Sequence, residues 1–165
     1  MKKINKIAFI GVGLINSSLA RDLKNSGFHN SSSAFSRTKK TREILRKLDI
    51  VDKVEETIEA TVKDADIVII GVPVAAFSNV IKKISNHLKE NTIITDVGSV
   101  KKSLITITKK YLPHGIDVFY KTVPQYVLEK MTNENAIMNN DRFSNIVFVD
   151  KELDNEENKN IINEF

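Results

Sequence analysis

The order of strand-like and helix-like segments predicts an α/β fold in which helices cover a doubly wound parallel sheet, in a single domain. A short apolar run at residues 6–10 enters a glycine-rich turn and leaves it as a helical pattern. Residues 67–70, Ile-Val-Ile-Ile, form a continuous β-branched run of the kind that is buried on both faces of a parallel sheet. Strand and helix patterns alternate as far as residue 119, which is typical of parallel strands joined by right-handed crossovers.

The individual elements follow from local patterns. Apolar residues recur at helical spacing from Leu14 to Leu23, and Gly27 is a natural stop for that helix. Residues 30–35 are rich in serine, but their place after the first helix is that of a second parallel strand. The other expected elements are a helix at 41–48, a brief strand at Ile50 and Val51, helical turns at 57–63, a helix at 75–88, strands at 92–95 and 116–119, and a helix at 101–112. Beyond residue 120 we expect an irregular stretch to 142, a strand at 144–149 and a helical pattern at 154–165.

The composition excludes several classes of protein. The 165 residues are enough for one domain with a sizeable core, and 41% hydrophobic and 28% charged residues are typical of a soluble globular protein. Without cysteine there is no disulfide, thiolate metal ligand or cysteine nucleophile, and we expect no metal site. The net charge is only +4, and no basic stripe interleaved with aromatics marks a nucleic-acid binder. No apolar run approaches the roughly 20 residues of a membrane span. We therefore expect a cytoplasmic protein that binds neither nucleic acid nor membrane.

The turn after the first expected strand is a candidate diphosphate site. Gly11 would allow the tight turn, and Gly13 would let the backbone approach phosphates without an intervening Cβ. Backbone N–H groups in the turn, up to Leu14 and Ile15, would converge with the positive end of the following helix. The third position of this dinucleotide fingerprint, normally glycine or alanine, is Asn16. The alternative is an ordinary loop before an amphipathic helix, and the strand and helix around the turn favour the nucleotide site.

The turn at residues 36–39 bears on the choice of cofactor. Ligands of open α/β sheets bind outside the carboxyl ends of the strands, and this turn is one of those expected there. Ser36, Arg37 and Thr38 stand where an NAD-binding protein would carry a carboxylate for the ribose 2′-hydroxyl. A hydroxyl with cations suits the 2′-phosphate of NADP, so we favour NADP over NAD. The alternative is that Arg37 only stacks on the adenine.

Two more turns complete the candidate site. Val72, Pro73 and Val74 follow the strand at 67–70 and are expected to contact the cofactor. Ser99 follows the next strand at the start of a helix. Its hydroxyl either caps that helix or hydrogen-bonds the substrate or the nicotinamide, in which case it is a catalytic residue.

Several motifs, taken together, resemble one family. They are Gly-Val-Gly-Leu-Ile at 11–15, Ser-Leu-Ala at 18–20, Ala-Asp at 65–66, Val-Pro-Val at 72–74, His-Leu-Lys at 87–89 and Thr-Asp-Val-Gly-Ser-Val-Lys at 95–101. From residue 6 to residue 119 the chain resembles the nucleotide-binding domain of prephenate and arogenate dehydrogenases, which act in tyrosine biosynthesis.

The resemblance implies a reaction and its parts. A hydride would pass from the substrate ring to NAD or NADP while the ring carboxylate leaves as carbon dioxide. A histidine would polarise the ring hydroxyl and accept its proton, assisted by Ser99. A following helical domain would bind prephenate or arogenate and form a dimer.

The chain departs from the family pattern in three places. Asn16 replaces the third glycine, and Val123 occupies the histidine position, where an aliphatic side chain can neither polarise a hydroxyl nor take a proton. The chain ends at Phe165, about where the family's helical domain would begin. We therefore expect an NAD(P)-binding domain at 1–150, the start of a truncated helical region at 151–165, and impaired or absent turnover.

Other interpretations remain open at this point. The chain could be a non-catalytic truncated remnant, an NAD(P)-binding interaction module, or a different reductase on the same fold. The sequence also leaves open whether the chain forms a homodimer and whether another chain supplies the helical domain.

Overall fold

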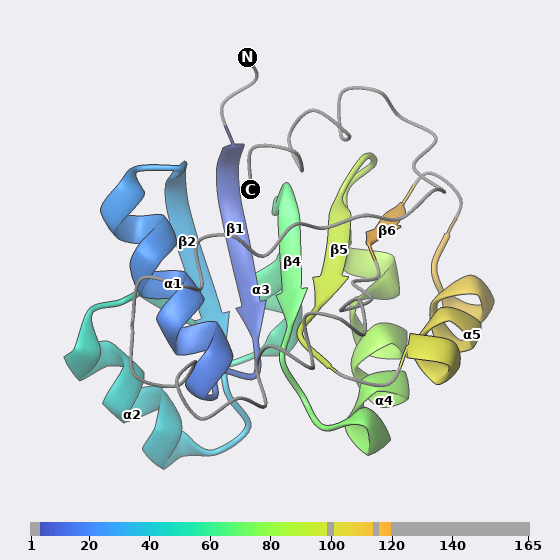
Figure 1. The fold of residues 1–165 in the computed structure, drawn as a ribbon, viewed down its shortest axis with the longest axis horizontal. Helices are drawn as coiled ribbons and strands as arrows, with labels where there is room; N and C mark the ends of the chain where they lie inside the picture. The colour runs from blue at the N-terminus through green and yellow to red at the C-terminus, as the bar shows by residue number, and fades with distance from the viewer. Residues whose placement is uncertain (1–3, 99–100, 114–115, 120–165) are drawn as a thin grey trace, which may run out of the picture.

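Within the residues that the structure describes, six parallel strands form one sheet. The computed structural model describes residues 4–98, 101–113 and 116–119 (Figure 1). The strand order is β3-β2-β1-β4-β5-β6. In chain order the elements are β1 (Ile4–Ile10), α1 (Leu14–Ser26), β2 (His29–Phe35), α2 (Lys39–Leu48), β3 (Lys53–Val54), α3 (Ile58–Val62), β4 (Ile67–Ile70), α4 (Val74–Ile84), the 3₁₀ helix η1 (Ser85–His87), β5 (Ile93–Asp96), α5 (Lys101–Tyr111) and β6 (Asp117–Phe119). The expected fold class, a doubly wound Rossmann-like parallel sheet, is confirmed.

The order of the strands reverses next to β1. One edge of β1 pairs with β2 and the other with β4, so that Ile10 lies between Phe35 and Ile70 at the carboxyl ends of the three strands. The loops that leave β1 and β4 diverge at such a point, and open α/β sheets bind their ligands in the crevice outside it. In Figure 1 the arrowheads of β1 and β4 point downwards, so this end of the sheet lies at the bottom.

Helices bury both faces of the sheet. Successive residues of β1 point to opposite faces: Ile7 and Phe9 belong to a core cluster that includes residues of α1 and α2. Ala8 and Ile10 belong to a second cluster that includes residues of α3, α4 and α5. Because residues 7–10 and 67–70 are buried on both faces, β1 and β4 carry continuous apolar runs rather than alternating ones.

β2 is confirmed as a strand in spite of its serines. The Ser33 hydroxyl donates to the carbonyl of Thr61 at 2.8 Å, and both residues are buried. Ser32 donates to the Asp52 carboxylate twice, from its backbone N–H at 2.6 Å and from its hydroxyl at 2.8 Å. A polar side chain with a hydrogen-bond partner can be buried at little cost. The alternation of elements therefore predicted this strand where its composition did not.

Two expected boundaries are wrong. The third strand is Lys53–Val54, and Ile50 and Val51 instead bury their side chains in the core from the loop before it. They are apolar because they are buried, not because they pair in the sheet. The helix expected at 75–88 ends at Ile84 and continues as the 3₁₀ helix η1.

Other expectations lie outside the described residues. These are the domain boundary after residue 150, the strand at 144–149 and the helical pattern at 154–165. Among the helices in the described part of the chain, none is long and apolar enough to cross a membrane.

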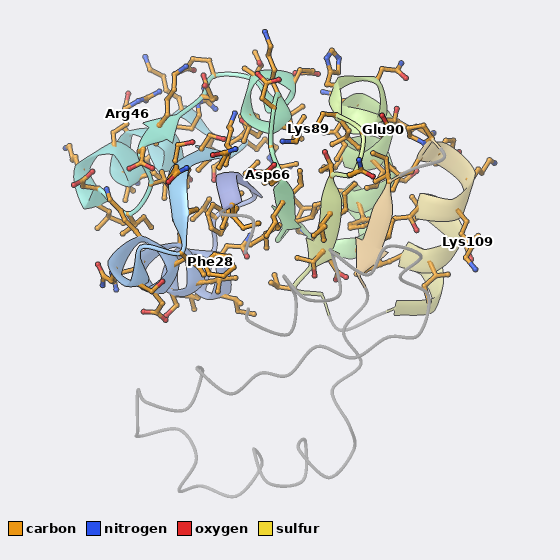
Figure 2. The ribbon with its side chains drawn as sticks, turned by 90° about the horizontal axis from the view of Figure 1, so that it is seen from above. Phe28, Arg46, Asp66, Lys89, Glu90 and Lys109 are labelled. Carbon is orange, nitrogen blue, oxygen red and sulfur yellow. The ribbon has the colours of Figure 1, made fainter. Side chains whose placement is uncertain are left out.

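Asp66 joins the amino-terminal ends of β1 and β4. Its Oδ2 accepts hydrogen bonds from the backbone N–H groups of Asn5 at 2.6 Å and Lys6 at 2.9 Å, and its Oδ1 accepts one from the Lys89 ammonium. Figure 2, which looks onto this end of the sheet, shows Asp66 and Lys89 close together. Burial raises the pKa of Asp66, but the hydrogen bonds from Lys89, Lys6 and Asn5 outweigh it and hold the pKa below its usual value.

We predict that Asp66→Asn lowers the free energy of unfolding at pH 7 by about 1–3 kcal/mol, because hydrogen bonds to an ionised acceptor are lost. A carboxyl group with a lowered folded-state pKa contributes its stability above the unfolded pKa of about 3.9 and loses it as the pH falls through the folded pKa. The difference between wild type and variant should therefore be full at neutral pH and shrink below about pH 4. Denaturant unfolding at several pH values measures it.

Glu90→Gln is the control, because Glu90 is an exposed carboxylate next to Lys89 in the sequence. We expect it to change the unfolding free energy by less than about 0.5 kcal/mol. A difference for Asp66→Asn that stays constant down to about pH 3 would contradict the role of the ionised carboxylate.

Candidate functional site

Gly11 forms a tight turn where β1 ends. Its φ is +78°, a conformation that favours glycine. A Cβ at this position would lie 2.6 Å from the Gly71 carbonyl oxygen and 2.8 Å from Cγ1 of Val72. Its own N–H donates to the Phe35 carbonyl at 2.9 Å. Both the backbone conformation and the close approach of the loop after β4 therefore require glycine at this position.

Gly13 and the first turn of α1 lie at the carboxyl end of β1 and carry N–H groups that no helical hydrogen bond uses. Gly13 is the N-cap of α1, and its carbonyl accepts the first helical hydrogen bond from Ser17 N–H at 2.9 Å. The N–H groups of Leu14 and Ile15 precede that bond and have no partner within the helix. The first turn carries no acidic residue to neutralise the positive end of α1. A Cβ at Gly13 would meet nothing within 4 Å, so the packing of the protein leaves this position open to an approaching group.

Exposed apolar side chains border the same end of the sheet. Leu14 is 91% and Ile15 is 56% exposed on the first turn of α1, and Val74 is 37% exposed on the first turn of α4. Both helices begin at the carboxyl ends of the strands (Figure 1). Ligand sites are lined mainly by apolar side chains, with a few polar groups that orient the ligand. The first turns of α1 and α4 supply both kinds of group.

Ser36 joins the turn after β1 to the end of β2. The residue is only 5% exposed, and its Oγ accepts a hydrogen bond from Val12 N–H at 3.2 Å. A hydroxyl that accepts one hydrogen bond still has a hydrogen to donate. Ser36 therefore lies at the expected end of β2, and its first role is to hold the turn after β1.

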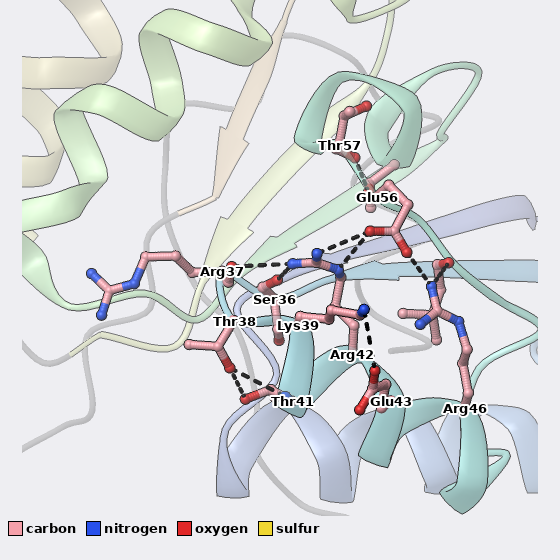
Figure 3. Close-up of polar contacts among 12 residues, drawn as sticks. Ser36, Arg37, Thr38, Lys39, Thr41, Arg42, Glu43, Arg46, Glu56 and Thr57 are labelled. Carbon is pink, nitrogen blue, oxygen red and sulfur yellow. Dashed lines mark hydrogen bonds and ion pairs between the residues drawn. The ribbon is translucent and has the colours of Figure 1, made fainter.

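Arg37 and Thr38 are exposed at the start of α2. Thr38 is the N-cap of α2, and its hydroxyl accepts a hydrogen bond from Thr41 N–H at 3.2 Å. The Arg37 side chain makes no hydrogen bond or ion pair with the described residues, and in Figure 3 it points away from the contacts drawn around α2. Arg37 is therefore a cation available to a ligand at the end of β2.

Arg42, which the sequence did not assign to the site, holds the loop between β2 and α2. Its Nη1 donates to the carbonyls of Ser36 at 2.8 Å and Arg37 at 3.1 Å, and its Nε and Nη2 donate to Glu56 (Figure 3). Its side chain is 12% exposed. Hydrogen bonds from Arg46 and Arg42 hold the pKa of Glu56 below its usual value. The sequence alone does not show whether a basic residue on a helix faces solvent or hydrogen-bonds to the carbonyls of a neighbouring loop.

The loop after β4 packs against the turn after β1. Gly71 N–H donates to the Ile10 carbonyl at 2.7 Å, and a Cβ at Gly71 would lie 2.7 Å from the Gly11 carbonyl oxygen. Pro73 is the N-cap of α4. The structure thus brings the residues expected to bind cofactor to one end of the sheet: Gly11, Gly13, Leu14, Ile15, Ser36, Arg37, Thr38, Val72, Pro73 and Val74.

The turn after β5 reaches the same end of the sheet. Val97 N–H donates to the Ile70 carbonyl at 3.1 Å, and Asp96, which is 5% exposed, accepts a hydrogen bond from Gly98 N–H at 2.7 Å. Ser99 follows Gly98 directly in the sequence, but Ser99 and Val123 lie outside the described residues, so their roles stay predictions. Within the described ranges, no group of three or more His, Cys, Asp or Glu side chains is placed to hold a metal ion.

Comparison with known families gives one match for this chain. Residues 19–119 match the model of the family described as prephenate dehydrogenase, nucleotide-binding domain, which is more than half of the chain. The chain belongs to this family. The match contains the turns after β2, β4 and β5 but begins inside α1, so the glycine turn after β1 is supported by its geometry rather than by the family model.

Individual relatives agree with the family. A cyclohexadienyl dehydrogenase from Zymomonas mobilis is 37% identical over 118 residues, which are 72% of this chain and 40% of the relative. A crystal structure of prephenate dehydrogenase from Aquifex aeolicus, in complex with hydroxyphenyl propionate and NAD+, has a TM-score of 0.64 at 26% identity and covers 72% of this chain and 42% of that one. Synechocystis arogenate dehydrogenase has a TM-score of 0.59 at 30% identity, covering 64% of this chain and 37% of that one. The chain thus spans about 40% of the length of these relatives.

We predict that Gly11→Ala and Gly13→Ala differ in their effect on the stability of this nucleotide-binding domain. Gly11→Ala should lower the free energy of unfolding by at least about 2 kcal/mol, because the new methyl group meets backbone atoms at a positive φ. Gly13→Ala should cost less than about 1 kcal/mol, because its methyl group enters open space and only the N-cap preference is lost. Denaturant unfolding of both variants measures this difference, and equal losses would contradict the close approach of Gly11 and Gly71.

Proposed function

We propose that the carboxyl end of the sheet, at the turns after β1 and β4, binds NADP or NAD, with a preference for NADP. On this proposal the chain is the cofactor-binding part of a prephenate or arogenate dehydrogenase. The observation that carries the proposal is the turn of residues 11–15, where unpaired N–H groups and the positive end of α1 meet open space at Gly13.

The diphosphate of the cofactor fits this turn on charge and on space. Its negative charge would be stabilised by the N–H groups of Leu14 and Ile15 and by the end of the α1 dipole, which no carboxylate of the first turn opposes. Gly13 would let the phosphate oxygens approach the backbone. Exposed Leu14 and Ile15, with Val72, Pro73 and Val74, offer apolar contacts for the nicotinamide half of the cofactor.

The preference for NADP rests on the end of β2. Residues 35–42 contain no carboxylate that could accept hydrogen bonds from a ribose 2′-hydroxyl. Arg42 is committed to the Ser36 and Arg37 carbonyls and to Glu56, whereas the Arg37 guanidinium is exposed and has no partner among the described residues. Arg37, with the hydroxyls of Ser36 and Thr38, is therefore suited to bind a 2′-phosphate by charge-assisted hydrogen bonds.

The chemistry follows from the family resemblance. A bound nicotinamide would supply a hydride acceptor for the substrate ring, whose carboxylate would leave as carbon dioxide. We assign to Ser99 a hydrogen bond to the substrate or the nicotinamide. Val123 stands where the family has its histidine, and loss of a general base costs about 10²–10⁴ in rate, so turnover should be weak.

We predict saturable binding of NADP+ to the wild-type chain, with a dissociation constant in the micromolar range (about −8 kcal/mol at 1 μM). Gly13→Ala should weaken this binding at least about tenfold, because its methyl group separates the donors from the diphosphate. Calorimetric titration measures both proteins, and the small stability change expected for Gly13→Ala makes it a test of the site alone. The absence of saturable binding below about 1 mM in the wild type would contradict the proposed function.

We predict that Arg37→Ala weakens binding of NADP+ by about 10- to 100-fold, since a charge-assisted hydrogen bond is lost, and leaves binding of NAD+ within about threefold of wild type. Titration of each variant with both cofactors measures the difference. Lys47→Ala is the matched control, because it removes an exposed cation from the other end of α2. Equal losses for the two cofactors would mean that Arg37 stacks on the adenine instead of binding the 2′-phosphate.

A second candidate is an NAD(P)-binding interaction module without turnover. Val123 at the histidine position favours it. A prephenate-dependent rise in NADPH absorbance from the purified chain, abolished in Ser99→Ala, would exclude it.

A further inference from the structure

Asn16 is the residue with which the chain departs from the glycine fingerprint, and the structure places it inside the protein. It lies in the first turn of α1 and is only 1% exposed. Its Nδ2 donates a hydrogen bond to the carbonyl oxygen of Gly11 at 2.9 Å. The asparagine side chain therefore points back toward the turn after β1 and is almost completely buried.

Gly71 makes room for Asn16. A Cβ at Gly71 would lie 2.4 Å from Nδ2 and 2.9 Å from Cγ of Asn16. In the usual fingerprint, a glycine on the helix allows the helix to pack closely against the strand. Here the residue without a side chain is on the loop after β4, and the helix carries the side chain that fills the space.

The hydrogen bond from Asn16 is one half of a clamp on a single peptide group. The Gly11 carbonyl and the Val12 N–H belong to the same planar peptide group. Hydrogen bonds at both ends of this group therefore fix the orientation of its plane. The oxygen of this unit accepts from Asn16 Nδ2 at 2.9 Å, and its nitrogen donates to Ser36 Oγ at 3.2 Å. Side chains from α1 and from the end of β2 thus hold the two ends of one peptide plane.

The side-chain amide of Asn16 suits this position because its NH₂ group can donate to the Gly11 carbonyl. A carboxylate of the same shape would present only acceptors to the Gly11 carbonyl. The remaining oxygen of the side chain, Oδ1, is buried and has no hydrogen-bond partner among the described residues. A buried polar atom without a partner costs free energy, which offsets part of what the Nδ2 hydrogen bond contributes.

We propose that Asn16 is a positioning residue of the diphosphate pocket. By holding the Gly11–Val12 peptide plane against Ser36, it sets the direction in which the following N–H groups, from Gly13 to Ile15, face the crevice. Asn16 thus stands at the position of the third glycine, but it acts through a hydrogen bond to the turn instead of through the absence of a side chain. This inference rests on the proposed binding of NADP at the turn.

Binding of two ligands separates this role from a general effect on the fold. NADP+ contains the diphosphate, whereas adenosine 2′-monophosphate contains only the 2′-phosphate and adenosine, the part assigned to Arg37, Ser36 and Thr38. Asn16→Ala and Asn16→Asp should weaken NADP+ binding by about 3- to 10-fold and by at least about 10-fold, respectively. Both should leave binding of adenosine 2′-monophosphate within about twofold of wild type. Calorimetry measures the affinity for NADP+, and chemical-shift titration measures the affinity for adenosine 2′-monophosphate. Both are done at a temperature at which circular dichroism shows that the variants are folded.

Ser18→Ala is the control, because Ser18 is exposed on the same helix. It should leave both affinities unchanged. Wild-type affinity for NADP+ in the folded Asn16 variants, or equal weakening of both ligands, would overturn the positioning role. Absence of NADP+ binding in the wild-type chain would instead overturn the proposed function on which the inference rests.

Discussion

The contact between the backbones of Gly11 and Gly71 is the constraint on which the site depends. These residues follow the two central strands, and each lies so close to the other's carbonyl oxygen that neither can carry a side chain without displacing backbone. The helices α1 and α4 begin shortly after Gly11 and Gly71, at this same end of the sheet. The first-turn N–H groups of α1 and the exposed apolar side chains Leu14 and Val74 therefore lie at the same end of the sheet.

Most polar side chains around this contact hold the backbone instead of facing a ligand. Ser36 and Asn16 fix one peptide plane of the first turn, and Arg42 fixes the carbonyls at the end of β2. Arg42 has committed its guanidinium donors in this way, whereas the Ser36 hydroxyl only accepts from Val12 N–H and keeps a hydrogen to donate. Among the described residues, the N–H groups of the first turn of α1 and the Arg37 guanidinium stay uncommitted, and the proposed function relies on them together with the Ser36 and Thr38 hydroxyls.

Some motifs that resemble the family have a structural role. Asp66 and Lys89 belong to such motifs, yet they lie at the end of the sheet opposite the crevice. There the Asp66 carboxylate joins backbone N–H groups of β1 to the Lys89 ammonium. Some motifs shared with an enzyme family therefore mark residues that stabilise the fold, and others mark residues of the candidate site.

The amino-acid sequence by itself determined the order of the elements, the parallel sheet and the turns that could carry a site. Hydrophobic runs and glycines report burial and backbone conformation locally, so β4 and the Gly11 turn could be predicted from their own residues. The apolar pair Ile50 and Val51 was wrongly predicted to be a strand. A buried loop segment and a buried strand both appear in a sequence as a short run of apolar residues.

Only the tertiary structure decided which side chains stay free and which hold the turns. That Gly71 makes room for Asn16, and that Arg42 rather than Arg37 binds the loop carbonyls, depends on segments far apart in the chain. The packing of the sheet brings such segments within hydrogen-bond distance, and no local pattern records a distance between them.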